Sequence, residues 1–212
     1  MKVLILGAAG QIPRYLTPML LVQTDAELVL FARNATNRIT VNDQSREALI
    51  DGDFSDGEAL KKAMQNVDVV YMNDASGNLS NMKTIVAIMK EAGVNKLILA
   101  SVLGIYGEVK GAFGEWNNRM VGPATDRREI ADYVEASGLE YTILRLTWLY
   151  NREGNFGYEV TQKGEDFKGA QVTRQAVAQL IVDIVKDTTG EFKNKSLGVG
   201  EPNTDFAKPS FY

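Results

Sequence analysis

Short, nearly continuous apolar runs alternate along the chain with longer stretches in which apolar residues recur at helical spacing. The apolar runs predict strands at residues 3–6, 27–31, 47–50, 67–72, 96–100, 141–146 and 196–199. The periodic stretches predict helices at residues 11–24, 57–65, 79–92, 126–136 and 173–186. Because strands that alternate with helices build a parallel sheet with helices on both faces, the pattern predicts an α/β fold with a doubly wound parallel sheet.

Two segments carry no convincing apolar period. Residues 107–122 contain four glycines around Trp116, and residues 147–172 follow a predicted strand without a clear pattern of their own. We expect both to be loops on the substrate side, because long irregular segments in a compact domain are commonly binding loops. No repeat or low-complexity linker divides the chain, which predicts one domain over residues 1–212 with a small C-terminal substrate region. The aromatic tail, residues 206–212, is expected to dock on the body of the protein or on a partner.

A glycine-rich turn separates the first predicted strand from the first predicted helix. Gly7 lets the chain turn sharply, and Gly10 has no Cβ to hold a bound group away from the backbone. The helix that follows directs its unpaired N–H groups and the positive end of its dipole into the gap, where a pyrophosphate fits. The order of strand, glycine turn and helix therefore predicts a dinucleotide-binding Rossmann fold.

A residue just past the end of the second predicted strand bears on the choice of cofactor. An acidic residue there would bond the ribose hydroxyls of NAD, whereas this chain has Arg33, which leaves room for a 2′-phosphate and neutralises it. Asn34 and Arg38 could assist. The alternative is that Arg33 is an ordinary solvated surface cation. We favour NADP over NAD, because the acidic residue is missing and an arginine stands in its place.

Composition removes several classes of function. The net charge of −4 argues against nucleic-acid binding, and the absence of cysteine and histidine excludes disulfides, thiolate chemistry and histidine-containing metal sites. No acidic loop with regular ligand spacing appears, so we expect no metal site. No segment approaches 18 consecutive apolar residues, so no membrane span is expected. We expect a soluble, cytoplasmic monomer or homodimer that acts on a small molecule.

Three short motifs carry a resemblance to a known family. Gly-Ala-Ala-Gly-Gln-Ile at residues 7–12, Phe-Ala-Arg at 31–33 and Ser-Gly-Leu-Glu-Tyr-Thr-Ile-Leu-Arg at 137–145 are similar to the atypical short-chain dehydrogenase/reductase proteins, the NAD(P)H-binding, NmrA-like group. The likeness runs from residue 1 to about residue 199. One departure is Pro13, where the family usually has a third glycine. Proline is accepted in the first turn of a helix, although its ring could alter how that helix packs against the strand.

The resemblance implies a set of cofactor contacts. Asp53 and Phe54 would lie beside the adenine, although an acid of this segment could equally cap the next helix, for which Asp56 is the better candidate. Small residues after the fourth strand would pass the ribose and pyrophosphate, and Trp148 would cover the nicotinamide end or else belong to the core. The cofactor-binding set is Gly7, Ala9, Gly10, Gln11, Ile12, Arg33, Asn34, Asp53, Phe54, Asn73, Ala75, Ser101, Arg127, Thr147 and Trp148.

The candidate catalytic residues are Ser101, Tyr106 and Arg127. Ser101 ends a central strand, so its hydroxyl could bond a substrate carbonyl or the nicotinamide, or simply its own backbone. Tyr106 could line the pocket as an aromatic wall or a phenol donor. Relatives with full hydride chemistry carry Tyr-x-x-x-Lys, and the usual spacing to residues 137–138 puts Pro123 and Arg127 at those two positions. Arginine can hold a ribose or a phosphate, but its pKa is too high to relay a proton as lysine does.

Together these features predict an NADPH-dependent oxidoreductase that transfers hydride to a small quinone, flavin or carbonyl acceptor. Without the family tyrosine, a quinone or flavin is favoured, because solvent can supply protons after hydride transfer. The alternative is a cofactor-binding module that senses NADP(H) and regulates a partner, or that has lost its activity.

Overall fold

The fold is built on one eight-stranded sheet. The computed structural model describes residues 1–73 and 77–212. The strands of the sheet are β1 (Lys2–Leu6), β2 (Glu27–Ala32), β3 (Glu47–Asp51), β4 (Val69–Met72), β5 (Lys96–Val102), β6 (Glu140–Leu146), β8 (Glu159–Thr161) and β10 (Lys195–Gly200). Their order is β3-β2-β1-β4-β5-β6-β10-β8, and every neighbouring pair is parallel except β10 with β8. The predicted doubly wound parallel sheet is confirmed.

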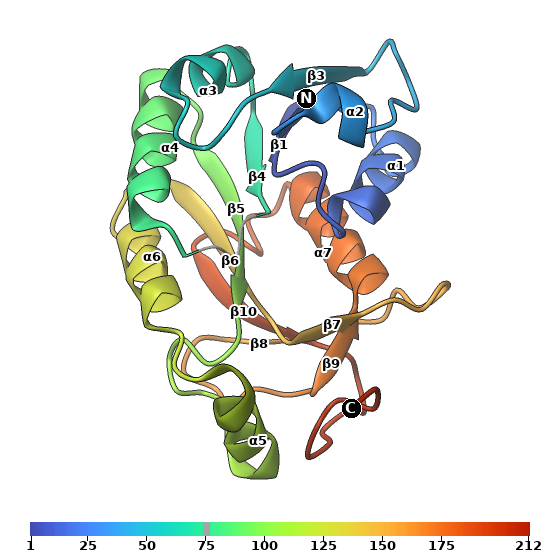
Figure 1. Cartoon of the computed structure of the whole chain (residues 1–212), viewed down its shortest axis with the longest axis vertical. Helices are drawn as coiled ribbons and strands as arrows, with labels where there is room; N and C mark the ends of the chain where they lie inside the picture. The colour runs from blue at the N-terminus through green and yellow to red at the C-terminus, as the bar shows by residue number, and fades with distance from the viewer. Residues whose placement is uncertain (74–76) are drawn as a thin grey trace.

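Helices cover both faces of the sheet. In Figure 1, α3 (Gly57–Ala63), α4 (Leu79–Glu91) and α6 (Thr125–Glu135) lie on the left, and α1 (Pro13–Gln23) and α7 (Arg174–Lys186) lie on the right. Each face has its own apolar core. Leu16 of α1 and Ile181 of α7 are fully buried on one side, and Ile85 of α4 and Val134 of α6 on the other. Strands buried on both faces read as continuous apolar runs, which is why the sequence pattern located them.

The prediction of a loop over residues 107–122 is wrong, because α5 (Gly111–Val121) occupies most of that segment. Its only buried residues are Gly114 and Asn117. A Cβ on Gly114 would lie 2.5 Å from the carbonyl oxygen of Val109, so this glycine is needed where the helix approaches the preceding segment. Gly111 and Gly114 lie inside the helix, and glycines lower helix propensity and are typical of loops, which is why the sequence predicts a loop here.

Two other segments for which the sequence predicts no helix or strand contain regular structure. Residues 147–172 include β8 and the pair β7 (Trp148–Tyr150) and β9 (Gln171–Thr173), which form a small parallel sheet of their own. The polar segment after β2 contains the single-turn helix α2 (Ala35–Arg38). The expectation of a loop over residues 147–172 therefore holds only between these strands.

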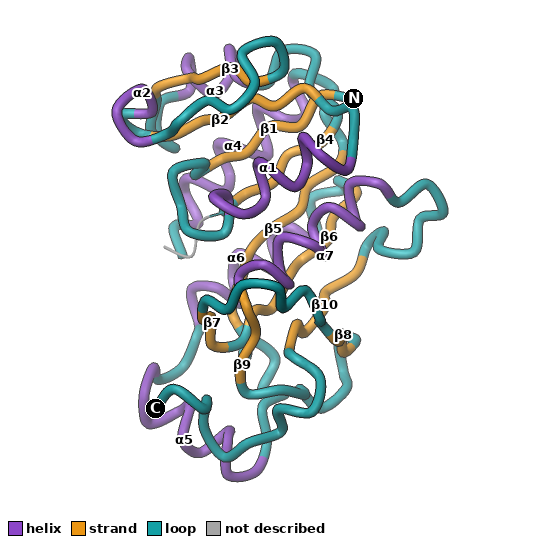
Figure 2. The backbone as a smooth tube through the Cα atoms, turned by 90° about the vertical axis from the view of Figure 1, so that its right-hand side faces the viewer, coloured by secondary structure: helices purple, strands orange, loops and turns teal. Residues whose placement is uncertain are grey.

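The C-terminal tail docks on the body of the protein. The rings of Phe211 and Tyr150 lie 5.5 Å apart, and the ring of Tyr212 lies 5.1 Å from Trp148 and 5.2 Å from Trp116. Figure 2 shows the tail beside α5 at the end of the molecule that also carries β7 and β9. Among the described residues, no helix is both long and apolar enough to cross a membrane.

The loop between α7 and β10 is organised by one carboxylate. Asp187 accepts hydrogen bonds from the Thr189 hydroxyl at 2.7 Å and from the N–H groups of Thr189, Gly190 and Phe192 at 2.8, 3.1 and 3.1 Å. These bonds, above all the one from the Thr189 hydroxyl, lower the pKa of Asp187 from 3.8 to about 2.

This lowered pKa predicts a specific acid sensitivity. The folded state favours ionised Asp187 more than the unfolded chain does, so the contribution to stability is full above a pH of about 4 and is lost as the pH falls through about 2. Asp187→Asn should therefore be less stable than the wild type near neutral pH, and the difference should shrink towards a pH of about 2. Urea unfolding at several pH values measures this difference. A difference that stays constant with pH would contradict the assignment.

Candidate cofactor and acceptor site

The glycine turn joins the end of β1 to the start of α1. Gly7 has a φ of +82°, and a Cβ there would lie 2.6 Å from the carbonyl oxygen of Asn73. A Cβ on Gly10 would collide with the side-chain nitrogen of Asn73. Both glycines are therefore required for the turn to approach the end of β4. Pro13 is the first residue of α1, where its missing N–H costs no hydrogen bond, so the helix starts as expected.

The side chain of Asn73 is held beside this turn by a hydrogen bond. Its Oδ1 accepts a hydrogen bond from the hydroxyl of Tyr71 at 2.9 Å, and Tyr71 is fully buried. Because the amide oxygen is held in this way, the amide nitrogen is the end that lies beside Gly10. The chain therefore presents a hydrogen-bond donor next to the first turn of α1, whose N–H groups have no intrahelical acceptor.

A cavity of about 420 Å³, here called the cofactor cleft, opens beside the turn. It is lined by Gly7, Ala9, Gly10, Ala32, Arg33, Arg38, Gly52, Asp53, Phe54, Asn73, Asn78 and Asn81. These residues come mainly from the carboxyl ends of β1 to β4, the edge at which open α/β sheets bind their ligands. Seven members of the predicted cofactor-binding set thus lie together: Gly7, Ala9, Gly10, Arg33, Asp53, Phe54 and Asn73.

Arginines gather at one end of the cofactor cleft. Nη1 of Arg38 donates to the carbonyl oxygen of Arg33 at 3.2 Å, and Nε of Arg33 lies 3.7 Å from Oδ2 of Asp53. Arg38 also lines an adjoining cavity of about 350 Å³ together with Arg14. Two guanidinium groups at one end of the cofactor cleft, those of Arg33 and Arg38, supply positive charge that suits a phosphate group.

The structure shows that Asp53 is not the residue that caps the next helix. Its Oδ1 accepts hydrogen bonds from the N–H and hydroxyl of Ser55 at 3.0 and 2.9 Å, and these bonds, with Arg33 nearby, lower the pKa of Asp53. Asp56 is the residue that caps α3, through a 3.0 Å bond from the N–H of Ala59 to its Oδ1. Asp53 therefore closes a local turn and faces the cofactor cleft, without capping a helix.

Within residues 1–73, three members of the predicted set do not line the cofactor cleft. Asn34, with a φ of 55°, donates its backbone N–H to Oδ1 of Asp51 at 2.9 Å and does not line the cofactor cleft. Ile12 is 5% exposed and packs in the core, and the side chain of Gln11 is exposed. For Ile12 only the backbone remains as a cofactor contact. Ala75 lies outside the described residues.

A narrow cavity of about 10 Å³ continues along the sheet from the cofactor cleft. It is lined by Ser101, Arg127 and Asn78 among others, and Asn78 also lines the cofactor cleft. Ser101 is the next-to-last residue of β5 and is 6% exposed. The fold therefore brings Ser101 and Arg127 together, as the sequence predicts, at a point with room for no more than about one water molecule.

Beyond Arg127 lies a larger cavity of about 560 Å³, here called the acceptor cavity. Thr147 and Trp148, both predicted, line it at the end of β6, and Trp148 Nε1 donates to Oδ1 of Asn117 at 2.9 Å. Sequence reasoning missed four other lining residues: Asn117, Arg174, Phe211 and Tyr212. Only the aromatic character of the tail could have pointed to the last two.

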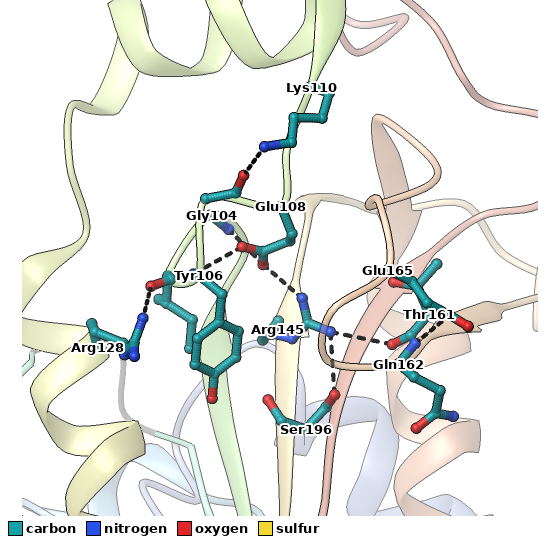
Figure 3. Close-up of polar contacts among 12 residues, drawn as sticks. Gly104, Tyr106, Glu108, Lys110, Arg128, Arg145, Thr161, Gln162, Glu165 and Ser196 are labelled. Atoms are coloured by element: carbon teal, nitrogen blue, oxygen red, sulfur yellow. Dashed lines mark hydrogen bonds and ion pairs between the residues drawn. The ribbon is translucent and has the colours of Figure 1, made fainter.

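Tyr106 is not brought to these cavities. Its hydroxyl donates to Oε1 of Glu135 at 2.7 Å, and burial is the main cause that raises the pKa of Tyr106. Its ring lies under the guanidinium groups of Arg128 and Arg145, at 4.8 and 5.4 Å from the ring centre. Figure 3 shows Tyr106 within a polar cluster that also contains Glu108, Arg128 and Arg145. The expected role as a pocket wall or phenol donor therefore finds no support in the described part of the chain.

The centre of the polar cluster is a buried ion pair. Arg145 is fully buried, Glu108 is 5% exposed, and their Nη1 and Oε1 atoms are 2.7 Å apart. Burial alone would raise the pKa of Glu108, but hydrogen bonds from Arg145 and from backbone N–H groups hold it below its usual value. Arg145 also donates to the carbonyl oxygens of Thr161 and Ser196, both at 3.2 Å, which ties β6 to β8 and β10. This arginine of the family motif is thus a structural residue.

Comparison with known proteins places the chain among cofactor-binding relatives. The profile of a family described as NAD(P)H-binding matches residues 7–188. A short-chain dehydrogenase/reductase from Veillonella parvula, solved in complex with NADP, has 38% identity and a TM-score of 0.92, with 99% of each chain covered. A Rossmann-fold NAD(P)-binding family protein from Shigella flexneri has 36% identity and a TM-score of 0.82, with 100% of this chain and 98% of that one covered.

Curated relatives are more distant. An isoflavone reductase homologue from Nicotiana tabacum is 28% identical over 162 residues, which are 69% of this chain and 48% of the relative. The chain therefore spans about half the length of that relative. The family profile covers most of the chain, and the fold and glycine turn agree with it, so the chain belongs to the NAD(P)H-binding family of atypical short-chain dehydrogenase/reductase proteins.

Proposed function

We propose that the protein is an NADPH-dependent reductase that transfers hydride to a small quinone, flavin or carbonyl acceptor. The observation that carries the proposal is the row of cavities along the carboxyl edge of the sheet. Asn78 is shared by the cofactor cleft and the narrow cavity, and Arg127 by the narrow cavity and the acceptor cavity. Such a row suits an extended dinucleotide with an acceptor beyond its reactive end.

The residues of the cofactor cleft fit NADPH. Arg33 and Arg38 would bind the 2′-phosphate, and the amide nitrogen of Asn73 with the first turn of α1 would bind the pyrophosphate. Ser101 and Arg127 would orient the nicotinamide end through hydrogen bonds to its ribose or amide. When bound, NADPH supplies a hydride, that is, two electrons and one hydrogen nucleus. The narrow cavity around Ser101 would keep water from this point.

The surroundings of Arg127 favour acceptors that need no proton from the protein. Pro123 and Arg127, the residues at the family's tyrosine and lysine positions, both line the acceptor cavity. Proline has no proton to donate, and arginine stays protonated at any ordinary pH. Quinones and flavins take up hydride and then collect one proton from water, so they balance the reaction without an enzyme acid.

Pro123 also favours the second candidate function. A chain that binds NADP(H) but has no proton donor at this position could act as a sensor that binds the cofactor and regulates a partner. Turnover separates the two candidates, because both predict cofactor binding.

Acceptor preference tests the proposal directly. We expect NADPH oxidation with menadione or riboflavin to be at least about tenfold faster than with a simple aldehyde, since a missing general acid typically costs about 10²- to 10⁴-fold. The decay of NADPH absorbance with each acceptor measures the rates. Ser101→Ala should lower them less than in a tyrosine-bearing relative. Aldehyde reduction as fast as quinone or flavin reduction would contradict this preference, and tight NADPH binding without any turnover would favour the sensor.

A further inference from the structure

The acceptor cavity carries positive charge without acidic side chains. Its lining includes the guanidinium groups of Arg127 and Arg174, and no aspartate or glutamate among the described residues. Arg174 is the first residue of α7, and its Nη1 donates to the neutral Oδ1 of Asn151 at 2.9 Å. No carboxylate in the described part of the chain forms an ion pair with Arg174. Partial burial lowers the pKa of Arg174, so an anion beside it would offset this loss of hydration.

The walls of the acceptor cavity are aromatic and fixed in place. Trp148 is held by its hydrogen bond to Asn117, and its ring lies 4.9 Å from Trp116 and 5.1 Å from Tyr212. Phe211 lines the same cavity. Rigid aromatic side chains of this kind bind flat rings through stacking and edge contacts. A cavity of about 560 Å³ is within the usual size range for small-molecule sites.

One buried polar atom in this cavity lacks a partner. Thr147 is 4% exposed, and its hydroxyl oxygen forms no hydrogen bond within the described residues. Buried hydroxyl groups are normally satisfied, because an unmade hydrogen bond costs free energy. Thr147 follows β6 directly and lines the acceptor cavity. A carbonyl or ring nitrogen of a bound ligand would supply the missing partner.

On the basis of the reductase function proposed above, we infer that the acceptor cavity binds a flat, conjugated acceptor that carries an anionic phosphate or carboxylate. The aromatic walls contact its rings, Thr147 bonds a polar atom of the ring system, and Arg174 pairs with the anionic group. A neutral acceptor of the same shape binds less tightly, since it leaves Arg174 without an anionic partner.

FMN and riboflavin test this inference because they differ only in a phosphate. Both tryptophans of the chain lie at or next to the cavity, so quenching of tryptophan fluorescence reports binding without any turnover. Titrations at low salt with saturating NADP⁺, which occupies the cofactor cleft, should show FMN bound at least about tenfold more tightly than riboflavin. Equal affinities would overturn the inference for a phosphate.

Variants of Arg174 test whether this residue causes the preference for FMN over riboflavin. Arg174→Gln should weaken FMN about tenfold and leave riboflavin within about twofold, whereas Arg174→Lys should keep most of the preference. Arg119→Gln is the matched control, because it removes an exposed charge of α5 that does not line the cavity. An equal loss in Arg119→Gln would show a non-specific charge effect and would overturn the assignment to Arg174. Circular dichroism and NADP⁺ binding check that each variant is folded.

A second ligand pair distinguishes recognition of a phosphate from recognition of a carboxylate. Anthraquinone-2-carboxylate should bind more tightly than its carboxamide if a carboxylate is recognised. A preference in only one pair identifies the phosphate or the carboxylate, and a preference in neither overturns the inference. NADPH oxidation with the same ligands, measured in samples without NADP⁺, tests the reductase function separately. Selective binding of the anionic ligands without turnover would reject the reductase function and support the anion site. Turnover of neutral and anionic acceptors at equal rates and with equal affinities would support the reductase function and reject the anion site.

Discussion

Glu108→Ala should destabilise the protein by about 3 to 5 kcal/mol, because it leaves the charge of Arg145 buried without its carboxylate. Arg145 is fully buried, and its Nη1 lies 2.7 Å from Oε1 of Glu108. Glu108 also accepts the backbone N–H groups of Gly104 and Tyr106 at 3.0 and 2.9 Å. The variant therefore loses the ion pair and also the bonds that hold the turn after β5.

Urea unfolding followed by circular dichroism measures this loss. Glu108→Gln should cost less than Glu108→Ala, because the amide keeps an acceptor oxygen and fills the same space. The double variant Glu108→Ala/Arg145→Met should be less destabilised than the sum of its single variants, because it no longer buries an uncompensated charge. A loss below about 1 kcal/mol for Glu108→Ala would mean that the pair behaves like an exposed one.

The sequence located the sheet because burial dictates its pattern. All residues of β4 are buried, and such strands must be apolar throughout. The same reasoning missed α5, because Gly111 and Gly114 lie inside it and glycines are typical of loops. It also missed β7, β8 and β9, each of which has three residues. Strands of that length carry too few positions for a period to be visible.

The predictability of site residues depends on how they reach the site. Arg33 and Asn73 follow strands directly, so the topology of the sheet sets their position once the strands are known. Arg174 and Tyr212 reach the acceptor cavity only through packing of distant segments, which no local pattern encodes. Tyr106 is also close to a strand end, but its hydroxyl bonds Glu135, away from the cavities.

Arg33→Ala should weaken NADPH binding by about 1.5 to 3 kcal/mol, roughly 10- to 150-fold, and spare NADH. The side chain of Arg33 is 77% exposed and lies 3.7 Å from Asp53. An exposed pair at that distance contributes little, so the guanidinium can pair with a phosphate at small cost. NADH has no 2′-phosphate, and the variant removes nothing that NADH uses. Titration of both cofactors by calorimetry measures the two affinities.

The neighbouring arginines test whether the phosphate is held by a group of cations. Arg38→Ala should also weaken NADPH selectively, because Arg38 lines the cofactor cleft and its Nη1 bonds the backbone of Arg33. Arg119→Ala removes the same charge from α5 and should change neither affinity. Equal losses for NADPH and NADH in Arg33→Ala, or a wild-type preference for NADH, would show that Arg33 is only a solvated cation. A loss confined to NADPH would instead assign the 2′-phosphate to the end of the cleft where Arg33 and Arg38 meet.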